Sequence, residues 1–261
     1  MDPLNVIRTQ SDRFAEVLTD TDPQARVPSC PEWNASDLLW HLTEVHLFWA
    51  GILADDVRSE EGVEAVENAK PERPGTTAAI LPLREQATDR LVEQLAQLDD
   101  SEPRWSWWGA DQTVGFTRRM QVCEATMHRV DAELTAQLPI SAIEPELAGR
   151  LVDQCADVMW GWLPDWARYE PRAVVRIEAT DSGRDWLLEI GHWTGTGPES
   201  GQEFDMPRAV RAPQGAEPQG VAHAPAEDLA LWAWSRGGTA AVGGTDTART
   251  ALSALIEHGI D

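Results

Sequence analysis

The stretch CPEWNASDLLWHLTEVHLFWAGIL, residues 30–53, predicts a helix that packs into a helical bundle. Asn34 follows a proline-containing loop and can cap this helix, and Asp37 stands three residues later, close to a capping box. The apolar stripe of the helix consists of Leu38, Val45, Phe48 and Ile52. His41 falls on this stripe, so we expect its imidazole to face the interior and to need a partner there. His46 lies about 140° around the helix from His41 and is expected near the rim.

The rest of the chain divides into a helical part and a mixed part. Helix-like apolar spacing recurs at 4–19, 76–98, 116–138 and 144–166, whereas 54–75 is acidic and reads as a loop. After Pro171, residues 173–193 read as two strands around an Asp-Ser-Gly-Arg turn. A short helix, a strand and a closing helix follow. We therefore predict an α+β protein, with a four-helix bundle over residues 1–168 and a small α+β domain over residues 172–261.

Composition excludes several classes of function. The net charge is −23, with 44 acidic against 21 basic residues, so the surface repels nucleic acids and anionic membranes. Lys70 is the only lysine, which removes the GKS or GKT phosphate loop. The first residues show no secretory signal, and no apolar run reaches the roughly 18 residues that span a bilayer. Cys30, Cys123 and Cys155 are widely spaced without a CxxC motif, which fits a reduced compartment. We expect a cytoplasmic protein, either monomer or homodimer.

The segment VCEATMHRVDAEL, residues 122–134, carries the candidate chemistry. Glu124 and His128 are four residues apart, so they share one helix face, and their types are two of the three ligands of a two-histidine, one-glutamate zinc site. Taken alone, such a pair is more often a surface hydrogen bond. His41 from another helix would supply the third ligand, because bundles build internal metal sites from facing helices; the alternative is a satisfied core histidine. Asp131 can hold a ligating imidazole by its second nitrogen, or it can be a solvated or arginine-paired acid.

Three segments resemble the mycothiol-dependent maleylpyruvate isomerase family. VPSCPEWNASDLLWHLTEVHLFW, residues 27–49, resembles the N-terminal signature of the family, and FTRRMQVCEATMHRVDAEL, residues 116–134, resembles its second signature. APAEDLALWAWSRG, residues 224–237, resembles its C-terminal portion. The resemblance covers nearly the whole chain in the same order. It departs at Glu32, where the family usually has glycine.

The resemblance implies a DinB-like four-helix bundle that carries a divalent metal, usually zinc, joined to a small α+β domain. The implied metal ligands are His41, Glu124 and His128. Mycothiol is the implied thiol cofactor, and Arg236 is the closest match to an arginine that assists with a dicarboxylate substrate. A metal-activated thiolate would add to a cis double bond conjugated to a carbonyl, and rotation and elimination would give the trans isomer. Two alternatives stay open: a mycothiol S-transferase for detoxification, and a non-catalytic metal- or ligand-binding protein. The expected partners are a small-molecule substrate and a low-molecular-weight thiol.

Overall fold

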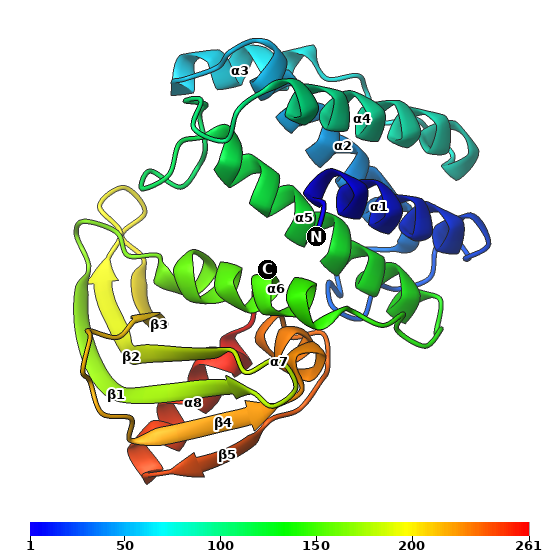
Figure 1. The fold of residues 1–261 in the computed structure, drawn as a ribbon. Coiled ribbons are helices and arrows are strands. Elements are labelled where there is room, and N and C mark those ends of the chain that lie inside the picture. Colours follow the sequence, from blue (N-terminus) through cyan, green and yellow to red (C-terminus); the bar gives the residue numbers. More distant parts are fainter. Residues whose placement is uncertain (261) are drawn as a thin grey trace. The chain divides into compact units, whose positions relative to one another are not determined.

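The computed structural model describes residues 1–260 and has the predicted α+β architecture. The chain divides into two compact units, Met1–Ser141 and the residues from Ala142 onward. Figure 1 shows the first unit as helices and the second as a sheet with its own helices. Among the helices of residues 1–260, none is both long and apolar enough to cross a membrane.

The first unit is a four-helix bundle with one additional short helix. Its elements are α1 (Pro3–Thr19), α2 (Ala35–Ala54), α3 (Glu60–Ala69), α4 (Thr77–Gln97) and α5 (Val114–Thr135). Helices α1, α2, α4 and α5 pack around a common core, and α3 lies beside α2. The expectation of a loop over 54–75 is wrong at α3. Two acidic residues in its first turn favour the helix through its dipole, and Val66 anchors it by burial.

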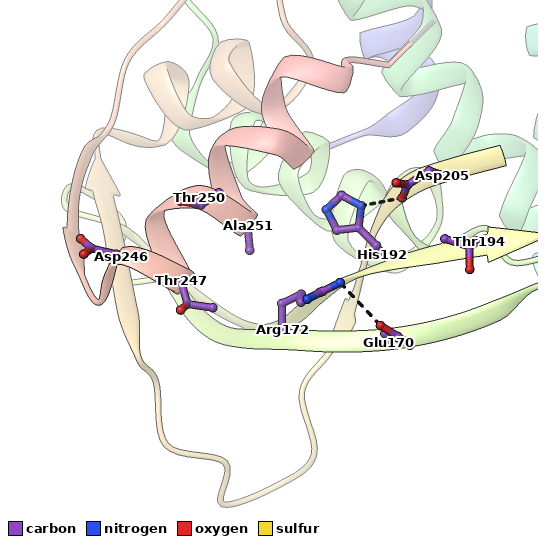
Figure 2. Close-up of a pocket in the computed structure, with 9 residues that line it drawn as sticks. All are labelled: Glu170, Arg172, His192, Thr194, Asp205, Asp246, Thr247, Thr250 and Ala251. Atoms are coloured by element: carbon purple, nitrogen blue, oxygen red, sulfur yellow. Dashed lines mark hydrogen bonds and ion pairs between the residues drawn. The ribbon is translucent and has the colours of Figure 1, made fainter.

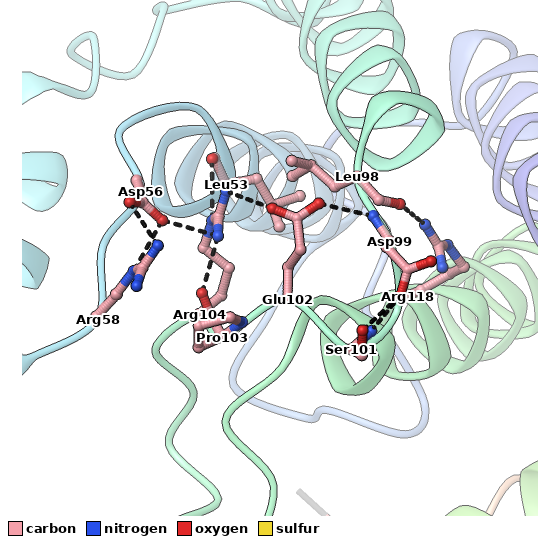
Figure 3. Close-up of polar contacts among 10 residues, drawn as sticks. All are labelled: Leu53, Asp56, Arg58, Leu98, Asp99, Ser101, Glu102, Pro103, Arg104 and Arg118. Atoms are coloured by element: carbon pink, nitrogen blue, oxygen red, sulfur yellow. Dashed lines mark hydrogen bonds and ion pairs between the residues drawn. The ribbon is translucent and has the colours of Figure 1, made fainter.

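The connection between α4 and α5 is held by arginines (Figure 3). The Arg104 side chain is 5% exposed; its Nε donates to the Leu53 carbonyl at 3.3 Å, and its Nη1 pairs with Asp56 at 2.8 Å. Near the start of α5, Arg118 Nη2 donates to the Leu98 carbonyl at 3.0 Å. These bonds tie the connection to the end of α2 and to α5, which fixes the first turns of α5 against the bundle.

The second unit is a five-stranded sheet with helices packed against it. Its elements are α6 (Pro145–Asp157), the 3-10 helix η1 (Met159–Gly161), β1 (Arg168–Ala179), β2 (Asp185–Thr196), β3 (Glu203–Arg211), β4 (Gly220–Ala224), α7 (Ala226–Ala233), β5 (Ala241–Gly244) and α8 (Asp246–His258). The strand order is β3-β2-β1-β4-β5. β1 and β2 form the predicted antiparallel hairpin, and β4 pairs parallel to β1.

The boundary between the units lies at 141/142, earlier than the expected 168–172. The reason is that α6 joins the sheet rather than the bundle. Asp153 on α6 accepts bonds from Arg184 Nη2 at 2.5 Å and from Trp186 Nε1 at 2.8 Å. Trp234 Nε1 donates to the Leu151 carbonyl of α6 at 3.0 Å. Helical periodicity alone does not reveal these partners, because each is distant in sequence.

Candidate metal centre

The two residues on α5 meet as their spacing predicts. Thr113 caps the start of α5 by accepting a bond from the Phe116 amide at 3.2 Å. Three turns further on, His128 Nε2 lies 3.1 Å from Glu124 Oε2. His128 is 7% exposed, so this is a contact within the bundle rather than an ordinary surface pair.

His41 reaches the same point from α2. The start of α2 is fixed by the predicted capping box, in which the Asp37 amide donates to Asn34 Oδ1 at 2.9 Å and the Asn34 amide donates to Asp37 Oδ2 at 3.0 Å. The His41 ring centroid is 4.8 Å from that of His128, with the rings 78° apart. The Trp33 ring centroid is 4.6 Å from that of His41. Sequence reasoning did not single out Trp33, although it lies in the same signature.

The donor set fits a small divalent ion. One ligand atom from each of His41, Glu124 and His128 lies within 4.8 Å of the other two. In a tetrahedral zinc site with Zn–N bonds of about 2.0–2.1 Å, the ligand atoms are about 3.3 Å apart. His128 Nε2 and Glu124 Oε2, which are 3.1 Å apart, already have about this spacing, and His41 completes the set within 4.8 Å. Two imidazoles and one carboxylate leave a coordination position for an exogenous ligand.

Asp131 lies behind His128, in the supporting position that its spacing suggested. Its Oδ2 is 2.9 Å from His128 Nδ1, and its Oδ1 accepts a bond from Ser29 Oγ at 2.5 Å. A carboxylate at Nδ1 keeps the proton on that nitrogen and leaves Nε2 as the atom that could bind a metal ion. Ser29, which the sequence reasoning missed, thus anchors the carboxylate from a loop 102 positions away.

The charges of the three residues differ sharply. Burial, assisted by the charge of His128, lowers the pKa of His41 to about 4, so its imidazole is neutral at pH 7. Burial alone would raise the pKa of Glu124, but the hydrogen bond from His128 lowers it, so the carboxylate is ionised. Burial also disfavours a charged His128, yet the bonds to Asp131 and Glu124 prevail and raise its pKa to about 9. A metal ion must therefore displace a proton from His128.

The expected positions of the α2 histidines need correction. His46 is not near the rim but fully buried, and its Nδ1 is 2.9 Å from Thr88 Oγ1 of α4. The buried residues at helical spacing on α2 are Leu39, Leu42, His46, Ala50 and Leu53. His46 thus lies on the core stripe, while His41 flanks it and is only partly buried. The cause is that α4 covers the side of α2 that carries His46, which the sequence of α2 alone does not indicate.

Arg236 lies in the second unit, just after α7. It is 7% exposed, and its Nη1 donates to the carbonyls of Trp234 at 2.7 Å and Ile260 at 2.9 Å. Two of the three cysteines lie near the two signature segments: Cys123 is buried in α5, and Cys30 lies half-buried before α2. Among the described residues, the only group of at least three potential metal-binding side chains that converge is His41, Glu124 and His128.

A hollow of about 500 Å³ lies between α8 and the sheet of the C-terminal unit (Figure 2). Four of its lining residues already form two pairs with each other. His192 Nδ1 is 3.1 Å from Asp205, and Arg172 is 3.5 Å from Glu170. Most of the lining is exposed, so the hollow has none of the buried, convergent donors of the bundle site.

Comparison with known proteins agrees with this fold. Residues 4–133 match the family model of the mycothiol maleylpyruvate isomerase N-terminal domain. A crystal structure of the mycothiol-dependent maleylpyruvate isomerase superposes with a TM-score of 0.61 at 14% identity, covering 92% of this chain and 91% of that one. A histidine-to-alanine mutant of that isomerase gives 0.59 at 13% identity with the same coverage, so the fold is shared. No curated protein matches the sequence. Through residues 4–133, the chain belongs to the mycothiol maleylpyruvate isomerase family.

Proposed function

We propose that the protein is a zinc-dependent, mycothiol-dependent enzyme that isomerises a small cis-unsaturated carbonyl compound. The observation that carries the proposal is the convergence of His41, Glu124 and His128 within 4.8 Å. They lie inside the domain that defines the family. The support from Asp131 behind His128 is what a ligating histidine requires.

Each residue has a distinct role in this proposal. His41 and His128 offer nitrogen atoms and Glu124 offers an oxygen, and Asp131 orients the His128 ring. When bound, the metal lowers the pKa of a thiol at its open position, so that thiolate is available at neutral pH for reversible addition to the conjugated double bond. The Trp33 ring packs on His41 and restricts its rotation.

Arg236 is proposed to bind a substrate carboxylate. A guanidinium suits bidentate recognition of a carboxylate because its N–H groups form a planar fork. The carbonyls of Trp234 and Ile260 hold Nη1 and thereby fix the plane of the group. The proposed role of Arg236 rests on the family resemblance of residues 224–237. Mutation of Arg236 tests this role without changing any of the three proposed metal ligands.

The proposal is tested by assaying the zinc-loaded protein with mycothiol against maleylpyruvate and, separately, against a generic electrophile. We expect cis-to-trans conversion of the first without net consumption of thiol. Stable thiol adducts with the second, and no conversion of the first, would identify a mycothiol S-transferase instead. Turnover of neither substrate by the zinc-loaded protein would contradict the enzymatic proposal and favour a binding protein.

A further inference from the structure

The core of the bundle contains polar side chains that the metal centre does not use. Each of the four packed helices contributes at least one. They are Ser11 on α1, His46 on α2, Arg84 on α4, and Thr117 and Gln121 on α5. Four of them are fully buried and Arg84 is 7% exposed. Within residues 1–260, the Gln121 amide oxygen and nitrogen, His46 Nε2, Arg84 Nε and both hydroxyl oxygens have no protein hydrogen-bonding partner.

The proton arrangement of His46 follows from its neighbours. Thr88 Oγ1 lies 3.0 Å from the Arg84 carbonyl, which can only accept, so the hydroxyl proton is used there. The same oxygen must then accept from His46 Nδ1–H at 2.9 Å. Burial lowers the pKa of His46 to about 3, so the ring is neutral and Nε2 carries a lone pair. That nitrogen requires a donor.

Three of these groups adjoin the candidate metal centre. On α5, Thr117, Gln121, Glu124 and His128 follow one another at steps of four, three and four, so they share one face. His46 is close enough to Glu124, His128 and His41 for their charges to shift its pKa. Thr117, Gln121 and His46, which are fully buried, therefore continue the metal centre toward the bundle interior.

An apolar residue would suit a dry core better than any of these groups. An unbonded buried polar atom is costly, and native interiors contain few of them. Water resolves the mismatch because one buried molecule typically makes about three hydrogen bonds, as donor and acceptor. Buried water molecules can donate to His46 Nε2 and to the Gln121 carbonyl oxygen, and they can accept from the Gln121 amide and from Arg84 Nε.

We propose that the metal pocket continues inward as a hydrated polar chamber, in which water bonded to His46 and Gln121 supports Glu124 from the inner side. Gln121 and His46 are then positioning residues, acting through Glu124. The support of Glu124 rests on the function proposed above, whereas the hydration of the chamber does not.

Two threonines of α5 form a matched pair that tests hydration. Thr117 and Thr126 are both fully buried, but Thr126 Oγ1 donates to the Val122 carbonyl at 2.7 Å, while Thr117 Oγ1 has no protein partner in the described chain. In a hydrated chamber both hydroxyls are bonded, so Thr117→Val and Thr126→Val should each lower Tm, by about 2–4 °C. A rise in Tm for Thr117→Val, beside a fall for Thr126→Val, would show a dry core and overturn the proposal.

The role toward Glu124 is tested by Gln121→Met, which preserves volume and removes both hydrogen-bonding atoms. Zinc affinity, measured by competition with a chromophoric chelator, should weaken by about tenfold or more, as for other groups that orient metal ligands. An unchanged zinc Kd together with a raised Tm would contradict the role. A crystal structure should show water within about 3 Å of His46 Nε2 and the Gln121 amide; absence of density there would refute hydration. If the wild type binds no zinc, the proposed function fails. The Tm values of Thr117→Val and Thr126→Val and the electron density for water would still decide whether the chamber is hydrated.

Discussion

The proton on His128 provides the sharpest quantitative prediction, and Asp131→Asn is the perturbation that tests it. In the metal-free protein, the pKa of His128 is raised to about 9, although burial opposes the charged form. The difference from the ordinary 6.5 corresponds to about 3 kcal/mol in favour of the imidazolium, at 1.36 kcal/mol per pH unit. The hydrogen bond to Asp131, whose side chain is fully buried, is the largest contribution that raises the pKa. Replacing this carboxylate by an amide should therefore lower the pKa of His128 by at least about one pH unit.

The assay is an NMR pH titration of the histidine rings after chelation of metal. In the wild type, His128 should titrate near 9 and His41 should stay neutral down to about 4. Ser29→Ala is the control, because it removes only the hydroxyl that donates to Asp131 and leaves the carboxylate in place. His128 should therefore titrate well above 6.5 in that variant. Titration of the wild-type His128 at an ordinary pH, or the same midpoint in Asp131→Asn, would refute the electrostatic reasoning.

The same proton links stability to pH. The folded pKa of His128 is raised, so its stabilising effect is complete below about pH 6.5 and is lost as pH rises through about 9. The free energy of unfolding of the metal-free protein should therefore fall by up to about 3 kcal/mol over that window. Asp131→Asn should show a smaller fall, which urea unfolding at several pH values measures. Parallel curves for the two proteins would be inconsistent with this linkage.

Three further outcomes follow from the structure. The Glu133 side chain is fully buried and accepts hydrogen bonds from Arg13, from Arg129 and twice from Ser141. Glu133→Gln should therefore lower the free energy of unfolding by about 3–5 kcal/mol. The control Glu16→Gln, at an exposed residue, should lower it by less than about 0.5 kcal/mol. Despite burial, bonds from Ser141 and Arg129 lower the pKa of Glu133, so this stability should be present above about pH 4 and lost as pH falls further, which acid unfolding of both variants checks. Arg236→Lys should reduce kcat/KM for a dicarboxylate by about tenfold or more, because lysine lacks the planar fork, and should reduce kcat/KM for a neutral electrophile less. Equal reductions for both substrates would contradict a role of Arg236 in binding a carboxylate. With free zinc at a hundredfold excess over Kd, the free energy of unfolding should be about 2.7 kcal/mol higher than after removal of zinc by a chelator. Thermal unfolding measures this difference. An unchanged Tm would mean that no metal was bound.

Local signals in the sequence were sufficient for several parts of this molecule. The capping box of Asn34 and Asp37 marks the start of α2, and alternation around the Asp-Ser-Gly-Arg turn marks the β1–β2 hairpin. Glu124 and His128 meet because a helix places residues four apart on one face. Each of these features depends on neighbours within a few residues.

Features set by tertiary packing were not predictable in the same way. The burial of His46 depends on Thr88 in α4, and the anchoring of Asp131 depends on Ser29 from a loop far away in the sequence. The position of the unit boundary depends on the side chains of the sheet that α6 contacts, such as Trp186. Helical periodicity shows that a face is apolar, but several neighbouring elements decide together which face is covered.

The central claim is that His41, Glu124 and His128 hold one divalent metal ion. Its most direct test is metal analysis by mass spectrometry after zinc loading and desalting, on the wild type, on His41→Ala and on His192→Ala. His192 pairs with Asp205 in the other unit, so its loss is the matched control for removal of a histidine. We predict about one zinc per chain in the wild type and in His192→Ala, and loss of that zinc in His41→Ala. A wild type without zinc, or a His41→Ala variant that retains it in full, would contradict the account.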